Sequence, residues 1–469
     1  MTNMQTTRLP RARMIVGAAV AAVVAVAGVG IVLAPWPGLT RDPVAITATP
    51  PAGASVATCS GPLLAAGRDS ASASTVTDAA TERVITGTSD GSAPITTALT
   101  PANVSEGVGP TVVTAEPVAD VRTDLAAAGS AQIDDPDLRG FAASACTRAA
   151  MESWLVGGSG ATGTADLVVI ANPGDVAARV TLTVYGAEGA ATPTAGADLR
   201  IAPGAQRIIP VAALALGEES PVIQVTAAEA PVRASLQASI TRVLVPGGVD
   251  QTAASVAPTA DIVIPGWQVA EAPGAADASE VPAYLRLLSP TAAASATVTV
   301  WGPGGQVGDV QTVDLTAAVP LQLDLTGLPV GTYTARISST APTTGAIWST
   351  TGFGEGSDFA WFVAAEALTA PALIAVAAGP SPVLTLAASG DADQQVQLVA
   401  DAGAGATQEI AVPAGRPMTV PVEPGQVYRI VPGAGGVRAA IVYSGGGQLA
   451  GYPVPAGDVA AASIEVFPR

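Results

Sequence analysis

The chain has 469 residues, a formal net charge of −18, and charged side chains at only 12% of its positions. Because 49% of the residues are hydrophobic, the composition excludes a disordered chain. The acidic excess excludes duplex binding, which depends on neutralising phosphates, so we expect no nucleic-acid partner. The length suggests about three or four domains.

The N-terminus carries a basic and then an apolar segment. Arg8, Arg11 and Arg13 precede the uncharged run 14–34, which as a helix would reach about 31 Å and so cross a bilayer core. We predict a cytoplasmic tail (1–13) and a single-pass transmembrane signal anchor (14–34), with the C-terminal bulk extracellular at the cell membrane. A cleaved signal peptide is the alternative, because it also begins with basic residues. Its apolar core is usually shorter, and Pro35 follows the expected cleavage site.

A Pro/Ala/Thr-rich stretch, 35–58, predicts an extended stalk. Beyond it stand the two cysteines of the chain, Cys59 and Cys146. An isolated pair in an oxidising compartment predicts a disulfide, and closing so long a loop contributes about 4 to 5 kcal/mol in the chain-entropy model. A reactive thiol is the alternative, but the chain has no histidine to activate a thiolate and no Cys-x-x-Cys motif.

The remainder of the chain repeats one pattern. Residues 166–189, 284–305 and 383–405 each read as a buried strand, a turn, and a strand that alternates apolar and polar side chains. Ala-rich connectors follow at 248–267, 357–376 and 449–468, and 138–157 is a divergent relative. We expect each connector to close one unit, which predicts a disulfide-bearing β unit at 59–153 and β-sandwich units at 154–266, 267–376 and 377–469.

Units of about 100 residues with six or seven short strands are typical of immunoglobulin-like sandwiches. We therefore predict an all-β fold of tandem immunoglobulin-like β-sandwich units. A β-propeller-like repeat is the alternative, although its blades usually hold four strands in about 45 residues. If each connector is an edge strand carried into the next unit, the units would lock into one rod.

Several motifs resemble those of a known family. "CSGPL" at 59–63, "SAC" before "WLVGG", and "NPGDVAARVTLTVYGAEG" with "APGAQRIIPVAAL" are similar to an uncharacterised family of actinobacterial membrane-anchored secreted proteins. The resemblance covers most of the chain and implies an envelope location and a β-rich ectodomain. It implies no activity and no catalytic residues.

The residue types that are missing exclude many enzymes. Without histidine or lysine the chain has no Ser-His-Asp triad, no Ser-Lys dyad and no Schiff base. No phosphate-binding glycine motif stands in a strand-to-helix context. We therefore predict a protein that is not an enzyme and needs no cofactor.

Clustered acids are the remaining candidates for chemistry. Asp134, Asp135 and Asp137 could form the carboxylate pair of a hydrolase or bind calcium, and a solvated turn is the simpler alternative. Asp391 and Asp393 are a second candidate calcium pair. Neither segment has the full calcium-loop pattern.

One aromatic cluster could contact a ligand. Phe359, Trp361 and Phe362 stand together in the segment 358–364, and exposed aromatic rings can stack on sugars. The alternative is that these side chains pack in a core.

These observations favour a non-enzymatic, membrane-anchored, extracellular structural or interaction protein of the cell envelope. A binding module for cell-wall or capsular polysaccharide, accessory to an envelope glycosyltransferase, is the second hypothesis. A carboxylate-dependent hydrolase is the third. The expected partners are the membrane and an envelope protein or polysaccharide.

Overall fold

A computed structural model describes residues 9–33, 46–48, 51–66, 76–104, 107–270, 281–457 and 464–466. Most of the predicted tail and most of the predicted stalk lie outside the described residues. The chain divides into two compact units, Met1–Pro50 with Ala461–Arg469, and Pro51–Ala460. Each unit is described by itself.

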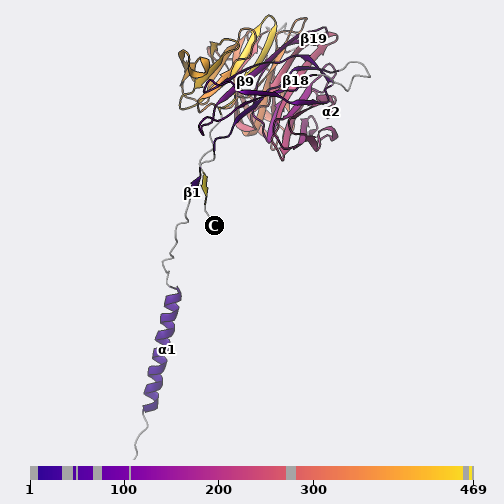
Figure 1. Cartoon of the computed structure of the whole chain (residues 1–469). Helices are drawn as coiled ribbons and strands as arrows, with labels where there is room; N and C mark the ends of the chain where they lie inside the picture. The colour runs from indigo at the N-terminus through magenta and orange to yellow at the C-terminus, as the bar shows by residue number, and fades with distance from the viewer. Residues whose placement is uncertain are drawn as a thin grey trace, which may run out of the picture. The chain divides into compact units, whose positions relative to one another are not determined.

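The smaller unit contains one helix and one strand pair. Helix α1 (Leu9–Leu33) covers most of the apolar run that predicted a helix (Figure 1). Its described side chains, residues 14–30, are exposed. Strand β1 (Ile46–Ala48) pairs antiparallel with β36 (Ile464–Val466). Within the described part of the chain, no helix meets the length and apolarity that crossing a membrane requires.

The larger unit is built from strands, which confirms the predicted all-β class. We divide it into four repeats. Repeat 1 spans 55–145 and contains β2 (Ser55–Thr58), β3 (Leu63–Ala66), β4 (Val76–Ala80), β5 (Arg83–Thr88), β6 (Ile95–Ala98), β7 (Thr100–Ala102), β8 (Thr111–Ala115), β9 (Leu125–Asp134) and β10 (Arg139–Ala145). Its strands form the sheets β10-β9-β5, β2-β8-β6 and β3-β4, and β7 pairs parallel with β16 of the next repeat.

Repeat 2 spans 152–253. It contains β11 (Glu152–Val156), β12 (Leu167–Asn172), β13 (Ala178–Gly186), β14 (Gly189–Ala191), β15 (Leu199–Ile201), β16 (Ala205–Pro210), β17 (Val222–Ala228), β18 (Arg233–Arg242) and β19 (Val245–Ala253), with the short helices η1 (Thr194–Gly196) and α2 (Val211–Leu214). One sheet has the order β11-β17-β13, with β14 and β15 beside β13, and the other has the order β19-β18-β12-β16. Their inner faces share one apolar core that includes Leu155, Val168 and Leu182.

Repeats 3 and 4 follow the same plan. Repeat 3 (259–363) contains β20 (Thr259–Val269), β21 (Ala283–Leu288), β22 (Ala294–Gly302), β23 (Gly305–Gln306), β24 (Gln311–Leu315), β25 (Leu321–Asp324), β26 (Gly331–Thr350) and β27 (Phe359–Val363). Repeat 4 (372–453) contains β28 (Ala372–Ala375), β29 (Val383–Ala388), β30 (Gln394–Val399), η2 (Asp401–Gly403), β31 (Thr407–Val412), β32 (Met418–Pro421), β33 (Val427–Val431), β34 (Val437–Gly445) and β35 (Gln448–Pro453). The long strand β26 replaces two strands, because its first half pairs with β20 and β22 and its second half pairs with β21 and β27.

The divisions between repeats differ from those expected from the sequence. The Ala-rich connectors 248–267 and 357–376 each supply the last strand of one repeat and then the first strand of the next. Strand β20 begins before the predicted boundary at 267, and it pairs with β26 of repeat 3. Strand β28 likewise precedes the boundary at 377 and pairs with β33 of repeat 4. Residues 55–58, which we assigned to the stalk, form β2.

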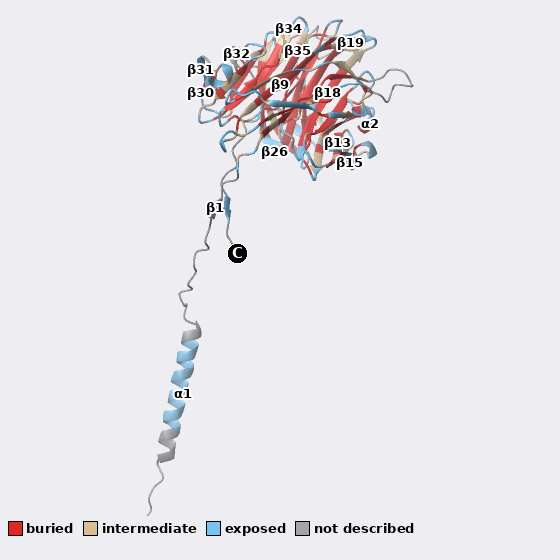
Figure 2. Ribbon diagram, viewed as in Figure 1, coloured by how far each residue is buried: buried red, intermediate tan, exposed pale blue. Residues whose placement is uncertain are grey.

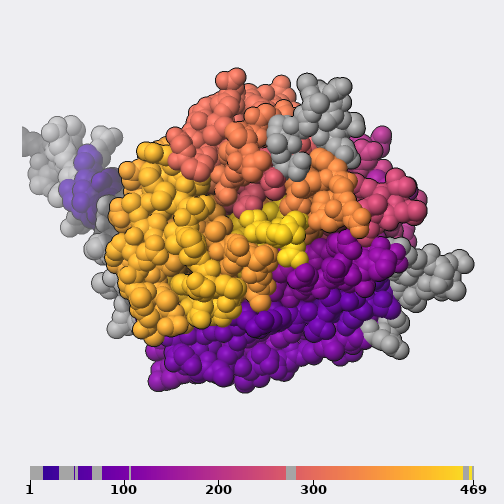
Figure 3. Space-filling view, turned by 90° about the horizontal axis from the view of Figure 1, so that it is seen from above, coloured from indigo at the N-terminus to yellow at the C-terminus, as the bar shows by residue number. Residues whose placement is uncertain are grey.

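The four repeats close a ring, so the predicted rod is wrong. The last strands of the repeats, β10, β19, β27 and β35, pack side by side in that order, and β35 packs against β10. We call them the inner strands. Figure 3 shows the orange-to-yellow repeat 4 lying against the indigo-to-purple repeat 1. Phe141 and Ala143 of repeat 1 are members of the core cluster of repeat 4, which explains the closure: each repeat leaves an apolar face that its neighbour buries. Figure 2 shows the buried strands inside this unit.

One carboxylate joins all four inner strands. The backbone N–H groups of Phe141 and Leu449 donate to Oδ2 of Asp358 (2.9 and 3.3 Å), and those of Val249 and Phe359 donate to Oδ1 (3.1 and 3.0 Å). One donor comes from each of the inner strands β10, β35, β19 and β27. Burial raises the pKa of Asp358 to about 8, and the four donated hydrogen bonds act in the opposite direction.

Candidate binding site

A cavity of about 420 Å³ lies where the inner strands end. Every repeat contributes the segment that follows its inner strand, namely residues 145–150, 253–257, 364 with 366, and 453–457. Residues 55–57 of β2 also line the cavity, so both ends of the larger unit lie beside it. Because the cavity needs all four segments, it depends on ring closure.

The cavity wall is largely apolar, with a few polar groups. Small side chains and the buried Trp154 form much of it, and Asp124, Glu152 and Glu366 add carboxyl groups. The indole Nε1 of Trp154 donates to Oε1 of Glu152 (2.8 Å), and the amide of Gln224 donates to the same oxygen (2.9 Å), so this carboxylate is held in place. Burial raises the pKa of Asp124, with Arg429 acting against it. An apolar wall with few fixed polar groups is typical of small-ligand sites.

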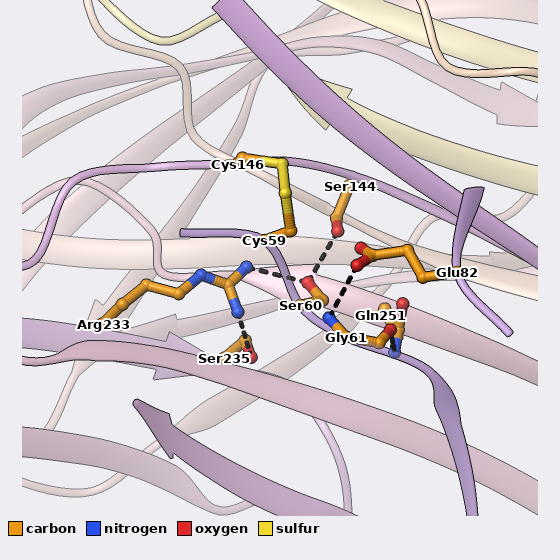
Figure 4. The surroundings of a disulfide bond; sticks show 9 residues. All are labelled: Cys59, Ser60, Gly61, Glu82, Ser144, Cys146, Arg233, Ser235 and Gln251. Atoms are coloured by element: carbon orange, nitrogen blue, oxygen red, sulfur yellow. Dashed lines mark hydrogen bonds between the residues drawn. A yellow bond between two sulfur atoms is a disulfide. The ribbon is translucent and has the colours of Figure 1, made fainter. Parts of the chain in front are cut away.

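A buried arginine lies at the cavity wall. Arg233, on β18, is 2% exposed. Its guanidinium donates to Oγ of Ser60 (2.8 Å) and of Ser235 (2.7 Å), and Ser60 also bonds the hydroxyl of Ser144 (2.6 Å), as Figure 4 shows. Its Nε has no hydrogen-bond partner. These bonds tie repeat 2 to repeat 1.

Glu82 is the counter-charge to this arginine. It accepts a hydrogen bond from the N–H of Gly61 (3.2 Å). Burial raises the pKa of Glu82 to about 7, and Arg233 acts in the opposite direction. Burial in turn lowers the pKa of Arg233 to about 10, with Glu82 opposing. Glu82 and Arg233 are thus buried groups that influence each other electrostatically, and replacing either would change the charge balance beside the cavity.

The predicted disulfide is present. Cys59 and Cys146 are bonded across a separation of 87 residues and are both buried (Figure 4). The bond joins the segment after β2, near the start of repeat 1, to the segment that follows β10 at its end. It packs with Ala57, Val113 and Ala127, and Cys146 also lines the cavity.

The predicted aromatic ligand contact is not exposed. Phe359, Trp361 and Phe362 are 0%, 3% and 3% exposed, because they lie on β27, whose two faces are both covered in the ring. The guanidinium of Arg286 lies 4.7 Å from the Trp361 ring. Core packing, the alternative considered from the sequence, is the correct interpretation. The sequence does indicate this burial, because residues 359–363 show no alternation of apolar and polar side chains.

The predicted acidic candidates lie in exposed turns and do not converge. Asp134, Asp135 and Asp137 occupy the exposed turn between β9 and β10, and Asp134 pairs with Arg139 (2.5 Å). Asp391 pairs with Arg336 (2.8 Å), and Asp393 accepts the N–H of Ala414 (2.9 Å). Among the described residues, no cluster of three or more acidic, histidine or cysteine side chains is arranged to hold a metal ion. The calcium prediction therefore has no geometric support.

The sequence did not indicate the buried ionisable groups of the ring. Asp166 accepts the N–H groups of Ser239 and Ser159 (2.8 and 2.7 Å), and Asp250 accepts the N–H of Trp361 (2.8 Å). Burial raises the pKa of each carboxyl to about 7. Arg286 donates to three backbone carbonyls of repeat 2, those of Gly158, Pro221 and Glu219. These groups are single acidic or basic residues in unremarkable segments, so no motif marks them.

The fold and the cavity define a class: a disulfide-bearing, all-β ring of four repeats with a cavity at one end of its inner strands. The chain belongs to a family of unknown function, DUF5719, which matches residues 101–423, more than half of the chain. A search of curated proteins found no match.

Proposed function

We propose that the protein is a membrane-anchored component of an actinobacterial cell envelope that acts by binding an envelope partner and not by catalysis. The observation that carries the proposal is the cavity, because all four repeats supply a lining segment to it. A ring whose closure creates one shared cavity is suited to holding a ligand or a partner segment.

The location rests on two features. Helix α1 begins within the basic N-terminal segment and continues through the apolar run, and it supports a signal anchor with the C-terminal bulk outside the cell. The disulfide supports an oxidising, extracytoplasmic compartment. A cleaved signal peptide would give the same compartment without the anchor.

The test is affinity purification of the full-length protein from its own membranes. Ala149 is half-buried in the cavity lining, so Ala149→Trp fills the cavity. Ala190, exposed on β14, provides the control Ala190→Trp. We expect an envelope component to be recovered with the wild type and the control, and about tenfold less with Ala149→Trp, which corresponds to about 1.4 kcal/mol. Equal recovery with all three proteins would contradict a role for the cavity.

Polysaccharide binding is the second candidate, and the composition of the cavity favours it. The carboxyl groups of Glu152, Glu366 and Asp124 offer hydrogen-bond acceptors of the kind that sugar hydroxyls use. Retention of the ectodomain on purified wall polysaccharide, reduced by Ala149→Trp, would support this candidate. A lack of retention alongside recovery of a protein partner would exclude it.

A further inference from the structure

We propose that the hairpin tips at the other end of the inner strands form a protein-docking face, in which Val243 and Leu244 insert into an apolar pocket that has a basic rim. This inference names the kind of partner for the binding role proposed above, and it rests on that role. It uses a surface separate from the cavity.

The tips lie at the same level around the ring. Gly140, Gly248 and Asp358 stand at equivalent positions, because an added Cβ at either glycine would lie 2.6 Å from Oδ1 of Asp358. The turns that precede these positions, 135–138, 243–244 and 351–357, therefore lie at the same end of the ring. The inner strands run from these turns to the cavity, so the turns form the end of the ring away from both of its termini. We call this end the distal face.

Contacts between the tips join them into one surface. Arg139 of the first tip pairs with Glu355 of the third tip (3.6 Å). The guanidinium of Arg242, at the second tip, lies 5.3 Å from the Phe353 ring of the third. The hydroxyl of Thr351 donates to the carbonyl of Gly447 in the fourth tip (2.8 Å). The distal face is therefore continuous across the four repeats.

The second tip breaks the usual sequence rule for its turn. Arg242 pairs with Val245, which leaves Val243 and Leu244 as a two-residue β-turn. Val243 has φ +58°, a conformation that such turns normally assign to glycine or asparagine and that a β-branched residue rarely adopts. The two side chains are 95% and 86% exposed. A turn that is unfavourable for its own backbone and that presents two apolar side chains to solvent is expected at a binding site.

The charges around this tip identify the partner as a protein with basic residues. The tips carry four exposed carboxylates, those of Asp134, Asp135, Asp137 and Glu355. They outnumber the two guanidinium groups, those of Arg139 and of Arg242 beside Val243. The distal face therefore has a net negative charge. Anionic lipid would be repelled by these carboxylates, whereas a pocket with Lys or Arg on its rim complements them.

The experiment uses the full-length protein in its own membranes. A photocrosslinking benzoylphenylalanine is placed at position 244 or, as the control, at position 216, where Leu216 is equally exposed (86%) in repeat 2. We expect one discrete protein adduct from position 244 that position 216 does not give. The crosslinked peptide should be apolar and flanked by Lys or Arg. Its yield should fall severalfold with Asp135→Asn, and also with raised salt, because each weakens the charge contacts at the rim.

A second variant separates binding from folding. Val243→Asn with Leu244→Gly installs the residues that the turn prefers. We expect an equal or higher melting temperature and about tenfold weaker binding to the crosslinked partner. Adducts with lipid, with a second copy of this chain, or equally from positions 244 and 216 would overturn the proposal, as would an unchanged affinity of the double variant. If Ala149→Trp abolishes recovery of the envelope component while the distal variants do not, the cavity role stands and this inference fails.

Discussion

At the scale of single residues, the centre of the ring leaves no room for side chains beside Asp358. Gly248 has φ +120°, and a Cβ there would lie 2.6 Å from Oδ1 of Asp358 and 2.7 Å from the Phe359 ring. We predict that Gly248→Ala lowers the free energy of unfolding by at least about 2 kcal/mol, because it adds both backbone strain and overpacking. Gly304 is the control, since a Cβ there meets nothing within 4 Å, and Gly304→Ala should change stability by less than about 0.5 kcal/mol. Urea unfolding of both variants checks this prediction. Equal losses of stability would show that the surroundings of Asp358 are not tightly packed.

Buried carboxyl groups also make stability depend on pH. Burial raises the pKa of Glu82, Asp166 and Asp250 to about 7 and that of Asp358 to about 8, well above their values in an unfolded chain. Between pH 5 and pH 7 the folded state therefore holds protons that the unfolded state has released. We predict that the free energy of unfolding falls as pH rises through this window, by about 1.4 kcal/mol per pH unit for each carboxyl that keeps its proton.

The matched variant for this prediction is Asp250→Asn. The amide keeps an oxygen that can accept from Trp361 and Thr252, as Asp250 Oδ2 does, but it does not titrate. Its stability should vary less steeply with pH than that of the wild type, by about one group's contribution. Denaturant unfolding from pH 5 to 8 measures both slopes, and a stability that rises with pH would contradict the assignment of raised pKa values.

At the scale of elements, the sequence predicted the strands whose two faces have different surroundings. Strands β13 and β22 alternate buried and more exposed positions, and their segments show the expected alternation of apolar and Thr residues. The inner strands have no such pattern because both faces are buried, so their Ala-rich segments read as connectors. The sequence does not reveal that β26 is one continuous strand, since nothing local shows that a strand will pass from one sheet to the other.

The candidate site was predictable only in part, for a related reason. The disulfide followed from there being two cysteines in the chain and from the inferred compartment. The cavity and the hydrogen bonds around Asp358 could not be inferred from the sequence. Both are assembled from segments about 100 residues apart, and every segment contributes only one or a few small residues. Asp358 itself looks like any loop acid. Its role comes from the N–H groups of Phe141, Val249 and Leu449, three donors that only ring closure brings beside it.

At the scale of the whole molecule, repeats with similar strands can form a rod or a ring, and core sharing between repeats 1 and 4 decides the outcome. Phe141, on β10, packs within the core cluster of repeat 4, with its ring centroid 5.5 Å from that of Tyr443. Independent sandwiches would each carry a separate core. Here the core of one repeat is completed by the next, so loss of one contact weakens two repeats that are far apart in the sequence.

We therefore predict that heat unfolds the ring in one cooperative transition, although a chain of this size would ordinarily show several. Phe141→Ala should remove about 3 to 5 kcal/mol and shift the whole endotherm to lower temperature, because the cavity that it leaves lies in the core of another repeat. Ile95→Ala, at an exposed position of the edge strand β6, should leave the endotherm in place. Differential scanning calorimetry distinguishes the two architectures: if Phe141→Ala moves only one component of a multi-component endotherm, the repeats unfold independently and the closed ring does not govern stability.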